Sequence, residues 1–561
     1  MMNPATLAAM QQLNLPTTID YSRYDNLLEV LEHVVTHYGS KPAFSCLGHT
    51  LTFCEFAQQA KQFAAYLQQH SGLQQGDRVA IQLPNILQYP VVLYGVLLAD
   101  LVVVNTNPLY TARELKHQLN DSGAKMLIVL KNVAEAAQQI ITDTPVEQVI
   151  LTEIADFHPS PKRQLINGVV KYIKRMVPKL DFPVALSLRE AMALGKKAEY
   201  QPVAVTRDHL VALQYTGGTT GVAKGAMLSH GNILANILQC QALFKSYGMT
   251  KGEETILVPL PLYHIYSFTV CMVMVEEGSH CILIPNPRDL SSVVKAIRNY
   301  GMTFFCGINT LFVALCHDTA FKKLDLSALK LTLSGGMALT ETAAKLWQQT
   351  TGCEIHQGYG LTETSPVISA NPGGGNKINT IGLPLADTDL VVMSEQGDML
   401  PMGEQGELCM RGPQLMQGYW QQPEETAKAI DAQGWFHTGD IGVLDPDGYH
   451  RIVDRKKDMI IVSGFNVYPN EIEAVASEHP GVLECAAVGV PDETKGETIK
   501  LFVVLKDKSV TAKELRAFCK VRLTGYKVPS EIIFYDELPK SAVGKILRRE
   551  LRDGPASAAT V

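Results

Sequence analysis

The sequence predicts an α/β protein in two parts, a large region (residues 1–454) and a smaller α+β region (residues 455–561). Strand and helix patterns alternate through most of the large region, which favours a parallel sheet covered by helices on both faces. From Ile381 onward, short strands alternate with turn residues, which indicates a β-rich subdomain. The charged run Asp454 to Asp458 marks the boundary between the two parts.

In the first half of the large region, apolar residues recur at helical spacing from Leu27 to Val35. A strand ending at Leu83 follows, then a helix through Leu98, both predominantly apolar. The pattern continues with a strand at 102–104, a helix at 112–122 and a strand at 125–130, and it breaks between 158 and 200.

Strand patterns resume in the second half at 210–213, 256–260, 281–284, 304–305 and 329–333, with a helix beginning near Asn232. In sheets of this kind, ligands bind beyond the carboxyl ends of the strands, where this chain has several unusual loops. In the smaller region, the sequence predicts a helix at 469–478, strands at 485–490 and 499–505, a helix at 512–522, a further strand and a basic terminal helix.

Composition limits the classes of function. The 561 residues are 46% hydrophobic and 19% charged, as in a globular enzyme, and the net charge of -7 argues against nucleic acid as a partner. The eleven cysteines include no Cys-x-x-Cys pair, which favours a reducing compartment over a disulfide frame or zinc site. With no signal-like N-terminus and no apolar run of about 18 residues, we expect a cytoplasmic location.

One segment leaves two interpretations open. Residues 169–177 are basic and amphipathic. They suit peripheral contact with the inner face of an anionic membrane. The interpretation we favour from sequence is a solvated surface helix that carries its charges outward.

The most informative stretch runs from Tyr215 to Gly225. Its glycines allow tight turns, and successive backbone N–H groups in such a loop form a concavity that binds anions. Lys224 follows Gly221 by a spacing that differs from the common Gly-x4-Gly-Lys-Ser/Thr loop, so a kinase-type fold is not indicated. We predict a triphosphate cradle, with a plain glycine-rich turn as the alternative; its residues are Thr216, Gly217, Gly218, Thr219, Thr220, Gly221 and Lys224.

Other segments carry chemistry at predicted strand ends. Tyr359 offers a face for a base, and Glu363 offers oxygen ligands to magnesium. Asp440 suits two ribose hydroxyls, Arg455 adds a contact to the sugar, and Lys545 follows a flexible glycine near the C-terminus. Each has an ordinary alternative when taken alone: Tyr359 as core filler, Glu363 as a helix-end charge, Asp440 as a turn former and Lys545 as a surface lysine.

Together these segments resemble the adenylate-forming superfamily of acyl-CoA synthetases, luciferases and peptide-synthetase adenylation domains. The resemblance runs from about residue 25 to 553. In the stretches 213–227, 435–441, 451–457 and 462–472 it is similar to bacterial long-chain fatty acyl-CoA synthetases. It implies two layered α/β sheets and a small distorted β-barrel in the N-terminal domain, with a small mobile C-terminal domain.

The resemblance also implies roles for individual residues. Tyr359 would lie against adenine, Thr362 would contact phosphate, and Lys545 would reach from the small domain to the carboxylate and α-phosphate. Glu363 would hold Mg²⁺, and His264 would stand near the acyl carboxylate. The remaining positions are Gly335, Gly336, Gly358 and Gly360 in the nucleotide pocket, Asp440 and Arg455 at the ribose, Lys457 at the hinge and Gly464 at the CoA channel.

The implied activity is ATP-dependent conversion of a long-chain fatty acid, through an acyl adenylate, to acyl-CoA. ATP and CoA would be co-substrates and Mg²⁺ the cofactor. A medium-chain or aryl acid–CoA ligase, an acyl-AMP ligase and a catalytically silent lipid-binding protein stay open as alternatives, as does a homodimer. Ser267 and Phe268 depart from the family pattern, which leaves the shape of the acyl tunnel open.

Overall fold

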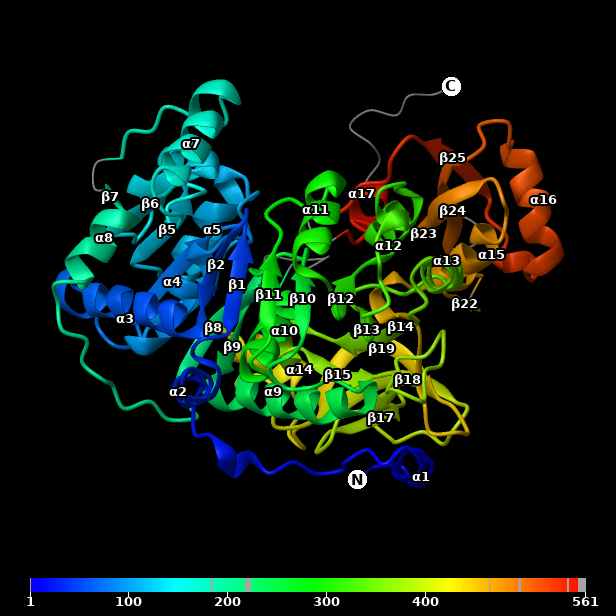
Figure 1. The fold of residues 1–561 in the computed structure, drawn as a ribbon. Coiled ribbons are helices and arrows are strands. Elements are labelled where there is room, and N and C mark those ends of the chain that lie inside the picture. Colours follow the sequence, from blue (N-terminus) through cyan, green and yellow to red (C-terminus); the bar gives the residue numbers. More distant parts are fainter. Residues whose placement is uncertain are drawn as a thin grey trace.

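The computed structural model describes residues 2–182, 185–216, 223–463, 465–492, 496–541 and 544–552. Gly217, Gly218, Thr219, Thr220, Gly221 and Gly464 lie outside these ranges, so their predicted roles stay predictions. Figure 1 shows the large α/β region on one side and the small region, with β24, β25 and α16, on the other.

The first sheet of the large region has nine strands. Its six central strands, from β14 to β1, run parallel, as the alternating pattern predicts. The order is β16 (Leu383–Pro384), β15 (Val367–Ala370), β14 (Ile355–Gly360), β13 (Leu331–Ser334), β12 (Phe304–Gly307), β10 (Thr255–Val258), β11 (His280–Leu283), β1 (Pro42–Cys46) and β2 (His49–Thr52). Its crossover helices are α10 (Ile265–Glu276), α11 (Leu290–Tyr300), α12 (Asn309–His317) and α13 (Glu341–Thr351).

The second sheet has seven strands and is parallel up to β8. Its order is β7 (Ala185–Ser187), β6 (Gln148–Thr152), β5 (Met126–Leu130), β3 (Arg78–Gln82), β4 (Val102–Asn105), β8 (Leu210–Thr216) and β9 (Lys224–Ser229). The helices connected with it are α3 (Phe53–His70), α4 (Gln88–Leu98), α5 (Ala112–Ser122), α6 (Glu135–Ile140), α7 (Lys162–Gly168) and α8 (Leu188–Gly195).

The glycine-rich stretch joins β8 to β9, which pair antiparallel with Thr216 opposite Lys224. The strand predicted at 210–213 and the helix predicted near Asn232 are confirmed, but a further strand, β9, lies between them and was not predicted. The chain first forms β9, and α9 (His230–Phe244) begins only after Ser229, whose side chain caps the helix. Lys224 is thereby held at the mouth of a hairpin, facing Thr216.

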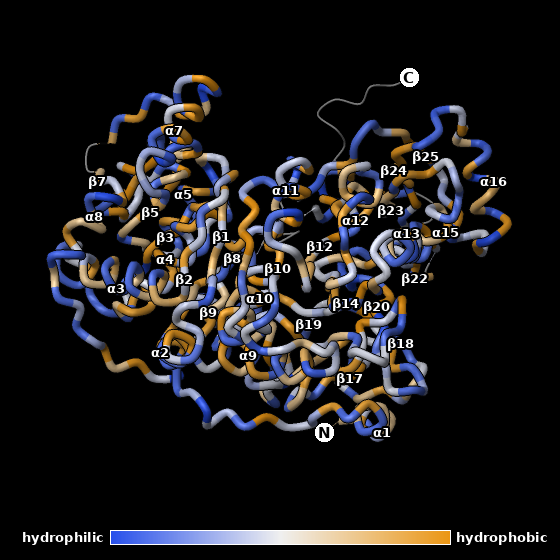
Figure 2. The backbone as a smooth tube through the Cα atoms, viewed as in Figure 1, coloured by the Kyte–Doolittle hydropathy of each residue, from blue (hydrophilic) through white to orange (hydrophobic). Residues whose placement is uncertain are grey.

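Apolar helices fill the space between the two sheets. Every residue of α4 is buried, and one hydrophobic cluster includes residues of both sheets. Asn85 links the sheets, because its side chain donates to the carbonyls of Val258 and Leu260 at 2.9 and 2.8 Å. Outer helices such as α16 instead alternate hydrophobic and hydrophilic residues (Figure 2).

The β-rich segment forms an open antiparallel sheet of four strands. These are β17 (Asp389–Met393), β18 (Gln405–Arg411), β19 (Phe436–Leu444) and β20 (His450–Arg455). Within the described residues, β17 and β20 are edge strands that do not pair with each other, so the distorted barrel that the resemblance implied is an open sheet. Three further helices complete this region: α1 (Pro4–Gln12), α2 (Leu27–Tyr38) and α14 (Pro423–Ala429).

The small region has a sheet and core of its own. Its strands are β22 (Phe465–Val467), β21 (Ile460–Val462), β24 (Gly496–Leu505), β23 (Val482–Asp492) and β25 (Glu531–Tyr535), the last beside β24. The helices α15 (Pro469–Ser477), α16 (Ala512–Arg522) and α17 (Arg548–Arg552) accompany it. Two separate hydrophobic clusters form within this region, as expected of a small α+β domain.

Across the described ranges, no helix combines the length and apolar content that crossing a bilayer requires.

Candidate active site

A cleft of about 3120 Å³ lies between the large and the small regions. Every predicted site residue within the described part of the chain lines it. Residues far apart in sequence, such as Lys224, Asp440 and Lys545, therefore face one space.

Asp440 is held from two sides. The Tyr359 hydroxyl donates to its Oδ2 at 2.7 Å, and Arg455 Nε lies 3.2 Å from its Oδ1. Asp440 and Arg455 face each other directly across β19 and β20, so the strand register sets this ion pair. Asp440 lies inside a strand and only 4% of it is exposed, which does not fit the alternative of a turn former.

Glu363 follows the end of β14 and is buried. Its Oε1 accepts a hydrogen bond of 2.7 Å from the Tyr419 hydroxyl, and its carbonyl accepts one of 2.8 Å from Met416 N. Among the described residues, its second carboxylate oxygen has no hydrogen-bond partner, although the residue lines the cleft. A carboxylate fixed on one oxygen and open on the other fits a hard cation such as Mg²⁺.

Sequence reasoning missed Tyr419. It is one tyrosine among twenty, and its bond to Glu363 spans 56 residues. No local pattern marks such a pairing, which depends on the loop that follows β18 returning to β14.

Lys224 is engaged by a carboxylate. Its Nζ pairs with Glu425 of α14 and lies 5.0 Å from the centre of the Tyr419 ring. Glu425 also pairs with Lys428 at 2.6 Å, and these two cations lower its pKa to about 2. A phosphate entering the cleft would compete with Glu425 for Lys224.

Lys545 brings the small region into the cleft. A β-carbon added to Gly336 would lie 4.0 Å from Lys545 Cε, and one added to Gly544 would lie 2.7 Å from Ile308 of the large region. Burial lowers the pKa of Lys545 to about 8, and the charge of Arg455 adds to this while that of Asp440 opposes it. An ordinary surface lysine does not have these surroundings.

A second ion-pair set fixes the segment that carries Lys545. Arg548 Nη2 lies 2.8 Å from Glu473 Oε1 and donates to Asn470 at 3.1 Å. Asn470 N in turn donates to Asp454 at 2.8 Å, which connects the tail to the end of β20. Sequence reasoning missed Arg548 and Glu473 because they pair across 75 residues.

His264 caps α10, and its Nδ1 accepts from Tyr266 N at 3.3 Å. Burial, followed by the charge of Lys545, lowers the pKa of His264 to about 4, so the ring is neutral at physiological pH. Gln214 supports this loop by donating to the Tyr263 carbonyl at 2.8 Å. A β-carbon on Gly335 would lie 3.1 Å from the Tyr266 ring, so this position leaves little room for a side chain.

Lys457 lies in the short turn between β20 and β21 and lines the cleft. Burial, followed by the charge of Arg455, lowers its pKa. It therefore stands where the chain passes from the last strand of the large region to the first strand of the small one.

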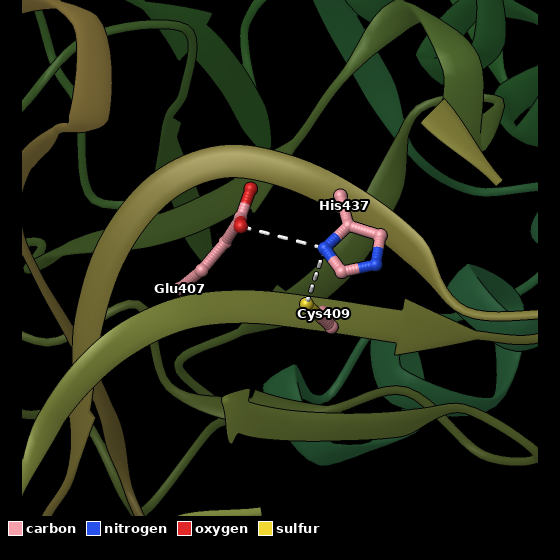
Figure 3. Close-up of side chains that lie close together, drawn as sticks. All are labelled: Glu407, Cys409 and His437. Carbon is pink, nitrogen blue, oxygen red and sulfur yellow. Dashed lines mark hydrogen bonds and ion pairs between the residues drawn. The ribbon is translucent and has the colours of Figure 1, made fainter. Parts of the chain in front are cut away.

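Glu407, Cys409 and His437 cluster on β18 and β19, and His437 precedes Asp440 on the same strand (Figure 3). His437 Nδ1 lies 3.3 Å from Glu407 Oε2 and 3.4 Å from Cys409 Sγ. Lys456 occupies the same Glu407 oxygen at 3.2 Å, and Gly439 N donates to the other at 3.0 Å. Because both Glu407 oxygens are engaged, the cluster fixes the strand segment that carries Asp440 rather than offering an open metal site.

Solved structures share this fold. The chain superimposes on o-succinylbenzoate CoA synthetase from Bacillus subtilis, solved with its acyl-adenylate intermediate, with a TM-score of 0.76 and 26% identity. The match covers 95% of this chain and 99% of that one. The fold and the cleft thus define the class of adenylate-forming enzymes.

The AMP-binding enzyme family model matches residues 31–420, and the AMP-binding enzyme C-terminal domain matches residues 471–545. The chain belongs to the AMP-binding enzyme family. It is 49% identical over 544 residues to the long-chain-fatty-acid–CoA ligase of Escherichia coli O6:H1, covering 96% of each chain. It is 50% identical to the ligase of the same name from Salmonella typhimurium, again over 96% of each.

Proposed function

We propose that this enzyme activates a long-chain fatty acid with ATP and transfers the acyl group to CoA. The relatives' names and the family membership support the reaction class. The observation that carries the mechanism is the position of Lys545, which enters the cleft beside Gly336 and within the electrostatic reach of Asp440 and Glu363.

In the first step, a carboxylate oxygen of the fatty acid attacks the α-phosphorus of ATP, and pyrophosphate leaves. Negative charge grows on the phosphate oxygens, so positioned cations and N–H donors accelerate the step. Lys545 would meet that charge from the small region. Asp440 and Arg455 would hold the ribose, and Tyr359 would lie against the adenine.

The other predicted residues complete this nucleotide site. His264, held neutral, would stand beside the acyl carboxylate without adding a charge. The phosphates would be cradled by Thr216, Gly217, Gly218, Thr219, Thr220, Gly221, Lys224 and Thr362, with Gly335, Gly336, Gly358 and Gly360 around the base.

Glu363 is the residue we assign to Mg²⁺. The oxygen that accepts no bond from the described residues would be the ligand, and Tyr419 would fix the other. A bound Mg²⁺ supplies charge neutralisation at the phosphates.

In the second step, the CoA sulfur attacks the acyl carbonyl carbon and AMP leaves. Lys545 occupies the approach to that carbon, so we propose that the small domain turns away about Lys457. Gly464 would then flank the CoA channel. We place the domain boundary between residues 454 and 455, one residue before β20 ends and this turn begins.

The apolar part of the cleft lining supports a long acyl chain. Residues of α9 and α10 contribute to this lining, and most of the following side chains are apolar: Cys240, Leu243, Phe244, Thr269, Val270 and Val273. A hydrocarbon gains roughly 0.8 kcal/mol for each CH₂ buried on such a surface.

The test is ATP-dependent thioester formation across acids from short to long, including aryl acids, with CoA as acceptor. We expect kcat/KM to rise with chain length into the long-chain range. If kcat/KM were highest for medium-chain or aryl acids, the proposed substrate class would be wrong, whereas the proposed reaction would stand. Adenylate formation without thioester would assign an acyl-AMP ligase, and no pyrophosphate release with any acid would contradict the proposal. A cytoplasmic location and a homodimer stay predictions.

A further inference from the structure

Residues 162–179, here called the basic segment, expose several large apolar side chains to solvent. They comprise α7, the π-helical turn Val169–Ile173 and the following loop, and no residue from Pro161 to Leu180 is buried. Its exposed apolar side chains are Leu165 (68%), Tyr172 (72%), Ile173 (75%) and Met176 (54%). Water contact with so many large apolar groups over a short stretch marks an interaction surface.

The charge of the basic segment has one sign. It holds six cations, and no acidic residue occurs between Asp156 and Asp181. Within the described chain, Lys171, Lys174 and Arg175 form no ion pair with a carboxylate. The cations are Lys162, Arg163, Lys171, Lys174, Arg175 and Lys179.

The basic segment is anchored at its base, and this presents its outer part to solvent. The Asn167 side chain accepts from Ala155 N and donates to Glu153, both at 3.0 Å. Further along, Asn132 donates to the Met176 carbonyl at 3.1 Å. Figure 1 shows α7 at the upper edge of the large region, on the side away from α16.

We propose that the basic segment docks the enzyme on membranes containing anionic lipids. Clusters of about four to eight Lys and Arg residues attract anionic headgroups, and interleaved apolar side chains enter the boundary with the acyl chains. The exposed Tyr172 and Ile173, flanked by Lys171 and Lys174, provide both elements. A solvated helix, the alternative left open by the sequence, would have its apolar residues covered.

The docking surface extends the proposed function without being required for it. Long-chain fatty acids partition into bilayers, so a membrane-bound enzyme would meet its substrate at the surface.

The experiment is flotation of the full-length protein with vesicles of phosphatidylcholine alone or mixed with phosphatidylglycerol, without ATP or acid. The wild type is expected to bind the anionic vesicles and to be released by high salt. The variant K171Q/K174Q/R175Q should lose about a hundredfold in partition coefficient, since each cation near the surface contributes roughly fivefold. Y172S/I173S should also weaken binding to the anionic vesicles. Because this variant removes no charge, the loss should depend less on salt concentration than the loss in K171Q/K174Q/R175Q.

Matched controls lie on α16, on the opposite side of the molecule. K513Q/R516Q/K520Q removes three exposed cations that form no ion pair among the described residues, and V521S removes an exposed apolar group. Both should bind vesicles like the wild type. Equal binding to neutral vesicles, equal loss in the controls, or unchanged binding of K171Q/K174Q/R175Q would overturn the proposal. Because no turnover is measured, failure here leaves the ligase proposal intact.

Discussion

The Tyr419 hydroxyl donates a hydrogen bond of 2.7 Å to Glu363 Oε1 and so fixes the carboxylate that we assign to Mg²⁺. Residues that orient a metal ligand commonly change metal affinity by about 10- to 100-fold when they are removed. We predict that Tyr419→Phe raises the Mg²⁺ concentration for half-maximal activity by about tenfold.

The measurement is initial rate against free Mg²⁺ at saturating ATP and acid. Tyr449→Phe is the matched control, because its hydroxyl donates to Gly375 at 2.7 Å, away from Glu363. An unchanged Mg²⁺ dependence for Tyr419→Phe would contradict the assignment of Glu363 as a ligand of Mg²⁺.

Asp440 provides a second prediction. Asp440→Asn keeps the shape of the side chain but removes the charge that pairs with Arg455. Hydrogen bonds to charged groups contribute roughly 1.5–3 kcal/mol, so ATP affinity should fall by about 10- to 100-fold.

Equilibrium ATP binding checks this. Asp445→Asn breaks a similar pair on the same hairpin, with Arg451 at 2.9 Å, and should leave ATP affinity nearly unchanged. Equal effects of the two substitutions would indicate a loss of hairpin structure instead of a ribose contact.

The pair between Lys224 and Glu425 yields a third prediction. ATP must draw Lys224 away from this carboxylate, so Glu425→Gln should tighten ATP binding. Exposed ion pairs are weak, and the gain is expected to be about two- to fivefold and to shrink at high salt. The control Glu424→Gln removes the same charge one residue away and should change ATP affinity little. Weaker ATP binding in Glu425→Gln would contradict the prediction and show that the carboxylate helps to position Lys224.

Much of this account could be predicted from sequence, because the motifs are local. Asp440 and Lys545 each lie in a short string that resembles the adenylate-forming superfamily, although each residue alone had an ordinary alternative. The predicted helix limits 112–122 and 512–522 match α5 and α16. The hairpin β8–β9 was missed, and the β-rich segment after Ile381 was predicted without its pairing as an open sheet, since strand pairing depends on partners that periodicity does not identify. Tyr419 and Glu425 were missed for the same reason: their partners are supplied by the fold.

The fourth prediction concerns pH. The charged form of Lys545 is the active one, and burial lowers its pKa to about 8 from 10.5. The ammonium is therefore present below about pH 8 and lost above it, so kcat/KM for adenylation should fall as pH rises through this range. Between about pH 8 and 10.5, Lys545 holds its proton in the unfolded chain but has lost it in the folded one. The folded state with Lys545 in the cleft therefore gains stability as pH rises through this range.

The pH profile is measured by pyrophosphate release. Lys545→Arg, which stays charged, should lower the rate through its different shape but should show no decline near pH 8. A decline that persists in Lys545→Arg would assign the titration to another group.

The central claim is that Lys545 serves adenylation and must leave before thioester formation. The most direct test is Lys545→Ala with the two half-reactions measured separately. Pyrophosphate release from ATP and fatty acid should fall by about a hundredfold or more. Thioester formation from supplied acyl adenylate and CoA should stay close to the wild-type rate, whereas an equal loss in both half-reactions would contradict the claim.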